Sequence, residues 1–376
     1  HLTVYAIYSI IYIRVNKMNY FTEDNIWKYL KNTNKPIIIY GMGNGADKVL
    51  KLFNHYGIKC SGVMASDSFV RGQSYNGFTV QKLSCFKEAL NDFIIAIAFG
   101  TQVPDVIGHI MELERLYEVV VPNVPVFGSN IFDDAFLHSN AEKIEAAYAL
   151  LSDSRSRAVF ENAVKFYYTG KLKYLWNCTD TKDEIFDNVL KLSPTENYID
   201  LGAYRGDTLQ ELIERAGGFN RAVALEPDPK TYKKLCLYIN DKPNVTAYQK
   251  TIWKNDTTLC FNNRGGRNST IGSSGTPVEA TCIDTLCNEI TPTYIKIDVE
   301  GFEEKLINGA IETIKKYKPL IAAAVYHKPD DLWRLPLKIK EILPDHSFFL
   351  RSYMNLNETV LYAVPKERLI NNEIYK

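Results

Sequence analysis

The amino-acid sequence predicts an α/β protein with two Rossmann-like domains, each built on a mostly parallel sheet covered by helices. Short apolar runs typical of buried strands alternate with amphipathic segments typical of helices, first over residues 36–122 and again over residues 195–365. In each region, one apolar strand leads into a glycine-containing turn, at Gly41 and at Gly202. A chain of 376 residues is long enough for two domains that each bury a core.

The composition excludes several classes of protein. The formal net charge is zero, so the chain lacks the basic excess that a phosphate backbone attracts, and we expect no nucleic-acid partner. The seven cysteines are scattered and form no C-x-x-C pair, which argues against a zinc site or a disulfide framework. They fit thiols in a reducing compartment, and we expect a cytoplasmic protein.

Residues 1–17 are expected to lie outside the fold. The apolar run over residues 1–13 is too short to span a bilayer as a helix, and it lacks the basic front and cleavage site of a signal peptide. A conventional polar stretch opens at Met18, which we take as the natural start. No membrane span is expected.

The predicted first domain, residues 18–126, contains a candidate nucleotide site. The strand over residues 36–40 leads into a G-x-G-x-x-A turn of Gly41, Gly43 and Gly45. A second strand, residues 60–65, ends near Asp67, about the spacing at which dinucleotide folds place a ribose-binding acid. The alternative is that the glycines only permit close strand–helix packing and that Asp67 starts a surface turn. Two further strands are expected at residues 92–101 and 117–122.

The predicted connector, residues 127–194, is rich in helix formers. One helix is expected from Ser154 to Tyr168, where Gly170 follows and interrupts the pattern. These helices could bridge the two domains or cover the mouth of the second one.

The predicted second domain, residues 195–376, opens with a strand, a tight turn and a helix. The pattern D-x-G-x-x-x-G places Asp200, Gly202 and Gly206 in this turn, where the backbone and the helix N-terminus can approach a nucleoside-like ligand. The next strand, residues 222–225, ends in Glu226. A carboxylate at that position is suited to holding a ribose diol by two hydrogen bonds.

Two later strands bring further polar residues to the same edge of the sheet. The strand over residues 294–298 delivers Asp298 and Glu300, and the strand over residues 319–326 delivers His327. Ligands of open α/β sheets lie outside the carboxyl ends of strands, so these residues are expected to share one crevice with Asp200 and Glu226.

Two other features complete the second domain. A loop over residues 262–276, dense in Gly, Ser, Asn and Arg, is predicted to close over the substrate. Extended runs at residues 346–351 and 358–364, separated by a turn at residues 355–357, predict an antiparallel hairpin at the sheet edge.

The segment from Leu150 to Val364 resembles the FkbM-type S-adenosylmethionine-dependent methyltransferases. The most specific part is the stretch Ile295–Glu303, which is close to the family's K-I-D-x-E-G-x-E core. Supporting similarities lie at residues 151–157, 198–208, 226–227, 283–286, 350–353 and 358–362.

This resemblance implies a class I methyltransferase fold that uses S-adenosyl-L-methionine to methylate a hydroxyl of a sugar, glycan or related metabolite. Asp200 and Gly202 would contact the methionyl end of the cofactor, Glu226 would hold the ribose hydroxyls, and Asp298 would lie beside the methyl donor. The whole implied set of cofactor-binding residues is Asp200, Gly202, Ala203, Gly206, Asp207, Glu226 and Asp298.

The catalytic candidates are His327, Asp298 and Glu300. Methyl transfer to oxygen needs alignment and a base that removes the hydroxyl proton. His327 is the preferred base because imidazole titrates near neutral pH, although it could instead be a capping or packing residue. Asp298 or Glu300 could take the role. The same three side chains could hold a divalent cation, but we expect a metal-free site.

The first domain loosely resembles the N-terminal domain of sugar O- and N-acyltransferases, through residues 62–67, Gly72 and residues 77–80. That resemblance favours a nucleotide-sugar over NAD. It also leaves a second function open, a sugar-modifying protein that binds NAD or a nucleotide-sugar and has its active site in the first domain. A third alternative is a nucleotide-binding module whose second domain is degenerate. The acceptor and the oligomeric state stay open, a homo-oligomer included.

Overall fold

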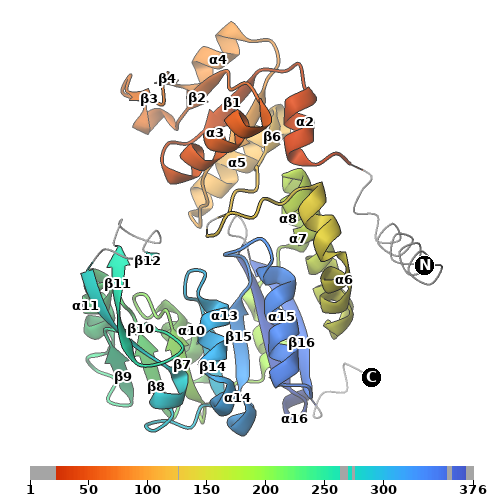
Figure 1. Ribbon diagram of the computed structural model, residues 1–376. Coiled ribbons are helices and arrows are strands. Elements are labelled where there is room, and N and C mark those ends of the chain that lie inside the picture. The colour runs from red at the N-terminus through yellow and green to blue at the C-terminus, as the bar shows by residue number, and fades with distance from the viewer. Residues whose placement is uncertain (1–22, 126, 263–269, 273–275, 354–357, 370–376) are drawn as a thin grey trace, which may run out of the picture. The chain divides into compact units, whose positions relative to one another are not determined.

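The computed structural model describes residues 23–125, 127–262, 270–272, 276–353 and 358–369 (Figure 1). The predicted leader, the turn at residues 355–357 and most of the loop at residues 262–276 lie outside the described residues. Within the described ranges, no helix combines the length and the apolar character needed to cross a membrane.

The chain forms two units. Unit 1 contains the sequence up to Glu145, residues 157–179 and residues 352–358, whereas unit 2 contains residues 146–156, 180–351 and 359–376. The predicted connector is therefore divided between the two units. Helices α6 (Asp134–Leu150) and α7 (Ser154–Thr169) each contribute residues to both.

Unit 1 is built on a six-stranded sheet with the strand order β3-β4-β2-β1-β5-β6. The strands are β1 (Ile37–Tyr40), β2 (Gly62–Met64), β3 (Ser74–Tyr75), β4 (Phe78–Gln81), β5 (Ile94–Ile97) and β6 (Glu118–Val120). All neighbours pair in parallel except β3 and β4, which form an antiparallel pair that the sequence did not predict. The four predicted strands are confirmed.

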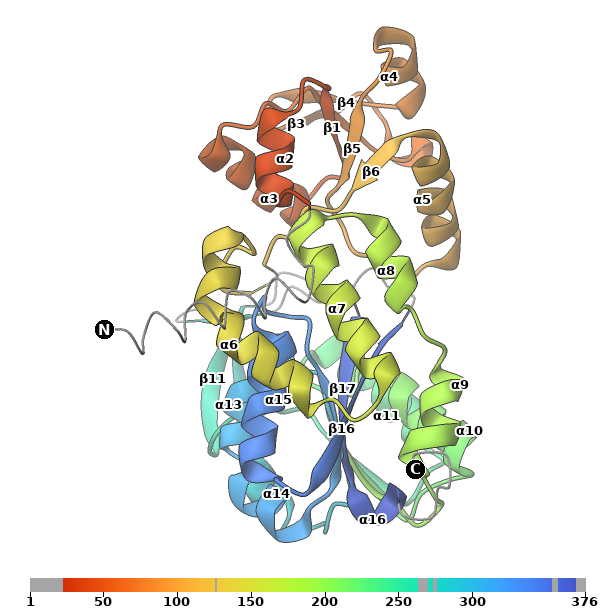
Figure 2. The same cartoon turned by 90° about the vertical axis from the view of Figure 1, so that its right-hand side faces the viewer.

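Helices cover both faces of the sheet of unit 1. They are α2 (Ile26–Asn32), α3 (Asn44–Tyr56), the 3₁₀ turn η1 (Asp67–Phe69), α4 (Leu83–Ala89), α5 (Pro104–Leu116) and α8 (Leu172–Cys178). Figure 2 shows α2 and α3 on one side of the sheet and α5 on the other. This arrangement follows from right-handed crossovers that run in both directions from the central strand β1.

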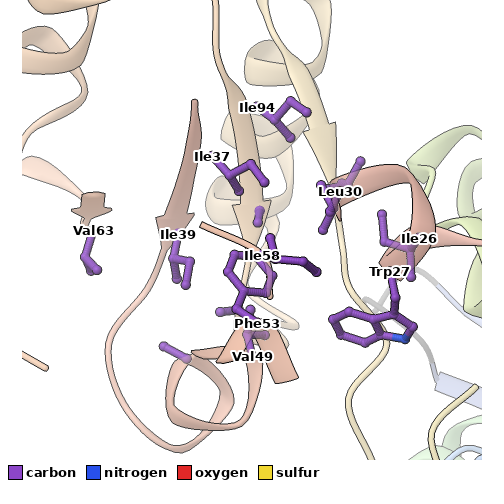
Figure 3. Packing of buried hydrophobic residues seen from close by; sticks show 14 of the residues in the cluster. Ile26, Trp27, Leu30, Ile37, Ile39, Val49, Phe53, Ile58, Val63 and Ile94 are labelled. Atoms are coloured by element: carbon purple, nitrogen blue, oxygen red, sulfur yellow. The ribbon is translucent and has the colours of Figure 1, made fainter. Parts of the chain in front are cut away.

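Alternate side chains of β1 point to opposite faces of the sheet, as in any strand. Ile37 and Ile39 join the buried cluster that contains Val49 and Phe53 of α3 and the residues of α2 (Figure 3). Ile38 and Tyr40 therefore lie on the other face. Fully burying side chains of this size contributes about 1.5–3 kcal/mol each, so this cluster fixes α3 on the sheet.

Unit 2 is built on a seven-stranded sheet with the order β16-β17-β15-β14-β7-β8-β9. The strands are β7 (Asn197–Leu201), β8 (Arg221–Leu225), β9 (Val245–Tyr248), β14 (Tyr294–Ile297), β15 (Leu320–Ala324), β16 (His346–Tyr353) and β17 (Glu358–Pro365). Five strands pair in parallel, and β17 pairs antiparallel with β15. The predicted parallel sheet and its C-terminal edge strands are confirmed.

The helices of unit 2 lie on both faces of its sheet. They are α9 (Lys182–Ile185), the π-helical turn η2 (Phe186–Leu190), α10 (Asp207–Ala216), α11 (Pro229–Ile239), α12 (Ile283–Leu286), α13 (Glu303–Asn308), α14 (Ile311–Tyr317), α15 (Asp331–Ile342) and α16 (Lys366–Leu369). Figure 2 shows α13, α14 and α15 on one side and α10 on the other.

A small second sheet in unit 2 has the order β10-β13-β11-β12. Its strands are β10 (Thr251–Ile252), β11 (Thr257–Asn262), β12 (Thr270–Gly272) and β13 (Thr276–Thr281). Both ends of the predicted substrate loop, at Asn262 and Thr276, and the segment Thr270–Gly272 within it therefore lie in strands, which the sequence did not predict.

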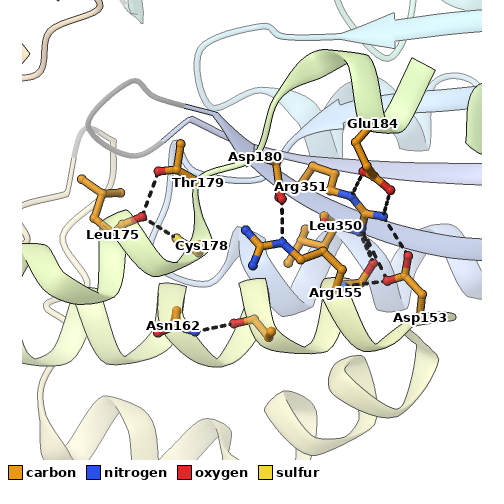
Figure 4. Close-up of polar contacts among 12 residues, drawn as sticks. Asp153, Arg155, Asn162, Leu175, Cys178, Thr179, Asp180, Glu184, Leu350 and Arg351 are labelled. Carbon is orange, nitrogen blue, oxygen red and sulfur yellow. Dashed lines mark hydrogen bonds and ion pairs between the residues drawn. The ribbon is translucent and has the colours of Figure 1, made fainter. Parts of the chain in front are cut away.

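Arg351 is a buried cation that ties together three segments of unit 2. Its side chain has no exposed surface, and its guanidinium donates to Glu184 Oε2 at 2.6 Å, Asp153 Oδ2 at 2.8 Å and Ser156 Oγ at 2.9 Å (Figure 4). Burial alone lowers the pKa of Arg351, but the two carboxylates raise it, so the charge is permanent. Strand β16 is thereby locked to the segments before α7 and after α8.

Replacing Arg351 with methionine should destabilise the protein by about 3–5 kcal/mol, because Asp153 would be left as a partly buried charge without its cation. The free energy of unfolding in urea measures this loss. The control is Lys182→Met, which removes a solvent-exposed partner of Glu211 and should cost about 0–1 kcal/mol. Equal losses in the two variants would contradict the role assigned to Arg351.

Candidate active site

The candidate site is built where four neighbouring strands of unit 2 end. In the strand order β15-β14-β7-β8, the carboxyl ends carry His327, Asp298, Asp200 and Glu226 respectively. The structure brings Asp200, Asp298, Glu300 and His327 together through ion-pair contacts, with Lys296 among them. Glu226 lies one strand further along.

Lys296 is a buried cation at the centre of this edge. Its Nζ donates to Gly202 O at 2.7 Å and lies 3.3 Å from Asp200 Oδ1 and 3.8 Å from Asp298 Oδ2. Burial lowers the pKa of Lys296, but the two aspartates outweigh that effect and raise it above the ordinary value. The sequence analysis missed this residue. The signal for it was a lysine between Ile295 and Ile297 in an otherwise apolar strand.

The turn after β7 passes so close to β14 that only glycine fits at position 202. A Cβ built on Gly202 would lie 2.0 Å from the carbonyl oxygen of Asp298, and the residue has φ +85°. Asp200 is completely buried, and its Oδ2 accepts a hydrogen bond of 2.5 Å from Thr208 Oγ1 of α10. The carboxylate therefore fixes the start of α10 relative to β7.

The remaining predicted residues of this turn have structural contacts. Ala203 is buried in a small cluster with Ala224 and Leu235, so its side chain is not directed to a ligand. Gly206 has φ +90°, and a Cβ there would meet the ring of Tyr238 at 2.5 Å. Asp207 is the first residue of α10, where its negative charge complements the helix dipole.

Glu226 is held rigidly at the end of β8. Its two carboxylate oxygens accept hydrogen bonds of 2.9 Å from the backbone N–H groups of Tyr204 and Asp228. Burial raises the pKa of Glu226 to about 7, against the lowering effect of these two donors. The carboxylate is thus fixed in place and titrates near neutral pH, with 8% of the residue exposed.

His327 is paired with a buried glutamate from the other side of the site. Its Nδ1 lies 2.7 Å from Glu303 Oε1, and both side chains are almost completely buried. The same Glu303 oxygen accepts from the backbone N–H of Gly301 at 3.1 Å. Glu303 therefore holds both the turn after β14 and the histidine after β15.

The charge on His327 follows from its neighbours. Burial lowers its pKa, but Glu303, Asp298 and Glu300 together raise it to about 9. Its Nε2 lies 3.6 Å from Asp298 Oδ1 and 3.5 Å from Glu300 Oε2. The ring is consequently an imidazolium at neutral pH, surrounded by three carboxylates.

A metal centre is not evident in the described part of the chain. No group of three or more His, Cys, Asp and Glu side chains there is arranged to hold a metal ion. Asp298, Glu300 and His327 lie close together, with His327 Nε2 3.6 Å from Asp298 Oδ1 and 3.5 Å from Glu300 Oε2.

In unit 1, the contacts of the glycine turn are mainly structural. A Cβ on Gly45 would lie 2.1 Å from Ala98 O, and one on Gly41 would lie 2.8 Å from the ring of Phe99. The N–H of Gly43 donates to the hydroxyl of Tyr75 in the β3–β4 pair. Asp67 lies in η1, just after β2, with its side chain 72% exposed.

The fold of unit 2 is that of the class I methyltransferases. Residues 200–350 match the model of the methyltransferase FkbM domain. The family resemblance drawn from the motif at Ile295–Glu303 is confirmed. A comparison with curated protein sequences finds no match.

Solved structures resemble the fold. A crystal structure of the methyltransferase FkbM from Methylobacillus flagellatus KT is 19% identical, with 90% of this chain and 92% of that chain covered and a TM-score of 0.67. The precorrin-6y C5,15-methyltransferase of Geobacter metallireducens GS-15 is 12% identical over 47% of this chain and 83% of that chain, with a TM-score of 0.31. Fibrillarin of Aeropyrum pernix, with natively bound S-adenosyl-L-methionine, is 11% identical over 46% of this chain and 69% of that chain, with a TM-score of 0.31.

These comparisons do not confirm the resemblance of residues 62–80 to sugar acyltransferases. They also give no support to NAD or a nucleotide-sugar in unit 1.

Gly202→Ala should cost at least about 2 kcal/mol of stability, because the added Cβ overlaps the Asp298 carbonyl in a left-handed conformation. The control is Gly217→Ala, where φ is +73° but the nearest atom to a Cβ is 3.8 Å away. That variant should cost about 1 kcal/mol. Urea unfolding compares them, and similar losses would show that the backbone conformation alone, not the close strand approach, requires Gly202.

Affinity for S-adenosylhomocysteine should rise with pH through about 7 if the Glu226 carboxylate binds the ribose diol, because only the ionised form accepts both hydrogen bonds. Calorimetric titration should give about tenfold tighter binding at pH 8 than at pH 6. Glu226→Gln should bind weakly at both values and lose this dependence. A wild-type affinity that does not change over this range would contradict the assignment.

Proposed function

We propose that unit 2 binds S-adenosyl-L-methionine at the ends of β7, β8 and β14 and methylates a hydroxyl of a sugar, glycan or related small metabolite. The observation that carries this proposal is the position of Asp298. This half-buried carboxylate lies beside the Asp200–Gly202 turn on one side and the His327 imidazolium on the other.

The residues present fit an adenosyl ligand. Glu226 offers a carboxylate whose position is set by two backbone donors, as a ribose diol requires. The turn at Gly202, Tyr204 and Gly206 has positive φ at all three positions, which lets its backbone approach a ligand closely. When bound there, the cofactor would supply an electrophilic methyl group on a sulfonium.

In the proposed reaction, Asp298 takes the proton from the acceptor hydroxyl as its oxygen accepts the methyl group. His327, with a pKa of about 9, already carries its proton at neutral pH and is therefore a poor base. The carboxylate of Asp298 is left as the proton acceptor. The imidazolium instead holds Asp298 and Glu300 by charge. His327 is then a positioning residue, and Asp298, the second catalytic candidate from the sequence, is the base.

Lys296 and Glu303 would orient this machinery without touching the acceptor. The ammonium of Lys296 holds Asp298 from the side of β7, and Glu303 holds His327 from the side of α13. A reacting group fixed in this way loses little freedom in the transition state, and that is where alignment contributes to rate.

The chemistry of this site supports a hydroxyl as the acceptor. A hydroxyl is far less acidic than water-exposed ammonium or carboxylic groups, so it needs a nearby carboxylate to take its proton. Two carboxylates, Asp298 and Glu300, about one third exposed, can also accept hydrogen bonds from neighbouring hydroxyls of a polyol. The seven cysteines form no disulfide, which supports the further proposal of a cytoplasmic location.

The function is tested by incubating the protein with S-adenosylmethionine whose methyl group is isotopically labelled and a panel of sugars, glycans and hydroxylated metabolites. The product is identified by mass spectrometry and NMR. Asp298→Asn should lower kcat by about 10²–10⁴-fold, because the acceptor proton has no receiver. Glu304→Gln, a neighbouring surface carboxylate paired with Arg334, should leave kcat unchanged.

Two results would contradict the proposal. Label on nitrogen or carbon rather than oxygen would exclude O-methylation. Unchanged kcat in Asp298→Asn, together with a large loss in His327→Gln, would return the role of base to His327.

A further inference from the structure

Unit 1 contains a pocket of about 530 Å³ that belongs to neither the glycine turn nor the methyltransferase site. It lies at the carboxyl ends of β1 and β2, on the face of the sheet opposite α3. Its walls come from η1, α4 and α5.

The lining of this pocket is mainly apolar. Tyr40 and Met64 are register partners on β1 and β2, and both are buried. The hydroxyl of Tyr40 is hydrogen-bonded to Ser66 Oγ at 2.6 Å, and its ring packs edge-on against Phe99 at 5.0 Å. The ring is therefore fixed in one orientation. Because Tyr40 and Met64 are almost completely covered, the surface open to a planar apolar group is that of Leu83 and Val106.

The rim is polar and carries both signs of charge. Asp67 and Asp105 contribute carboxylates, and Lys87 and His109 contribute basic groups. Asp67 is only loosely paired, at 3.7 Å from Lys82, and its carboxylate is mostly exposed. A carboxylate directly after the second strand of such a sheet is where two adjacent ribose hydroxyls donate their hydrogen bonds.

The contacts of the glycine turn argue against a diphosphate beside this pocket. The N–H of Gly43, which would face a phosphate, donates instead to Tyr75. The Tyr75 hydroxyl and the amide of Asn76 both donate to Asp47 Oδ1, at 2.5 and 2.8 Å. The first turn of α3 therefore carries a fixed negative charge that repels phosphate.

We infer that unit 1 binds a nucleoside in this pocket, with the base against Leu83 and Val106 and the ribose diol on Asp67. The ligand class differs from the dinucleotide or nucleotide-sugar that the glycine fingerprint suggested. The acid of that fingerprint, Asp67, keeps its role, whereas Gly41, Gly43 and Gly45 shape the packing of α3.

The test is calorimetric titration of the full chain with adenosine, guanosine, cytidine and uridine, in the presence of saturating S-adenosylhomocysteine so that unit 2 is filled. At least one nucleoside should bind, and its 2′,3′-dideoxy analogue should bind at least about tenfold more weakly because the diol is missing. Its 5′-monophosphate should bind no more tightly. The same titration of Glu226→Ala separates this site from that of unit 2, whatever the fate of the methyltransferase proposal.

Three variants locate the site. Val106→Trp fills the pocket from the surface of α5, and Asp67→Asn removes the diol acceptor; each should weaken binding at least about tenfold. Asp47→Asn, at the glycine turn, should leave nucleoside affinity unchanged. Circular dichroism checks that all three are folded.

The inference is overturned if no nucleoside binds, or if binding is indifferent to Val106→Trp and Asp67→Asn. Tight binding of NAD or a UDP-sugar that responds to Asp47→Asn would likewise overturn it, because that ligand would lie at the glycine turn.

Discussion

The site of unit 2 depends on one buried ammonium group. Lys296 lies on β14 between two isoleucines, and it reaches the Gly202 carbonyl and the Asp200 carboxylate of the neighbouring strand. An unpaired charge at this depth would cost several kcal/mol. Lys296 therefore requires Asp200 and the Gly202 carbonyl, and the buried Asp200 carboxylate requires Lys296. The consequence is that β7 and β14 end in register, with their turns in contact.

The second half of the site uses the same physical device with the charges reversed. Glu303 is the buried anion there, and the backbone of Gly301 and the ring of His327 satisfy it. Because Glu303 raises the pKa of His327, the histidine is charged over the physiological range. A lone histidine after a buried strand suggests a base. Glu303, the first residue of α13, changes the chemistry of His327 by pairing with it.

The sequence predicted much of the architecture. Apolar periodicity located the central strands of both sheets. Asp200 and Glu226, at the ends of β7 and β8, were identified because their positions depend on local strand–turn–helix patterns. Contacts between distant segments were not readable in this way. Lys296 lies within the family motif, but the motif alone gave it no role. The hydrogen bond from Gly43 to the Tyr75 hydroxyl involves β3, a strand that the sequence did not predict. The helical periodicity of the connector does not reveal which unit each of its helices packs on.

A crystal structure of the protein with S-adenosylhomocysteine tests the central claim most directly. The account predicts the ribose hydroxyls within hydrogen-bonding distance of Glu226, the amino-acid end of the ligand near Asp200 and Gly202, and the sulfur facing Asp298. It also predicts that Lys296 keeps its contacts with Gly202 and Asp200. A ligand bound elsewhere, or a ribose that makes no contact with Glu226, would contradict it.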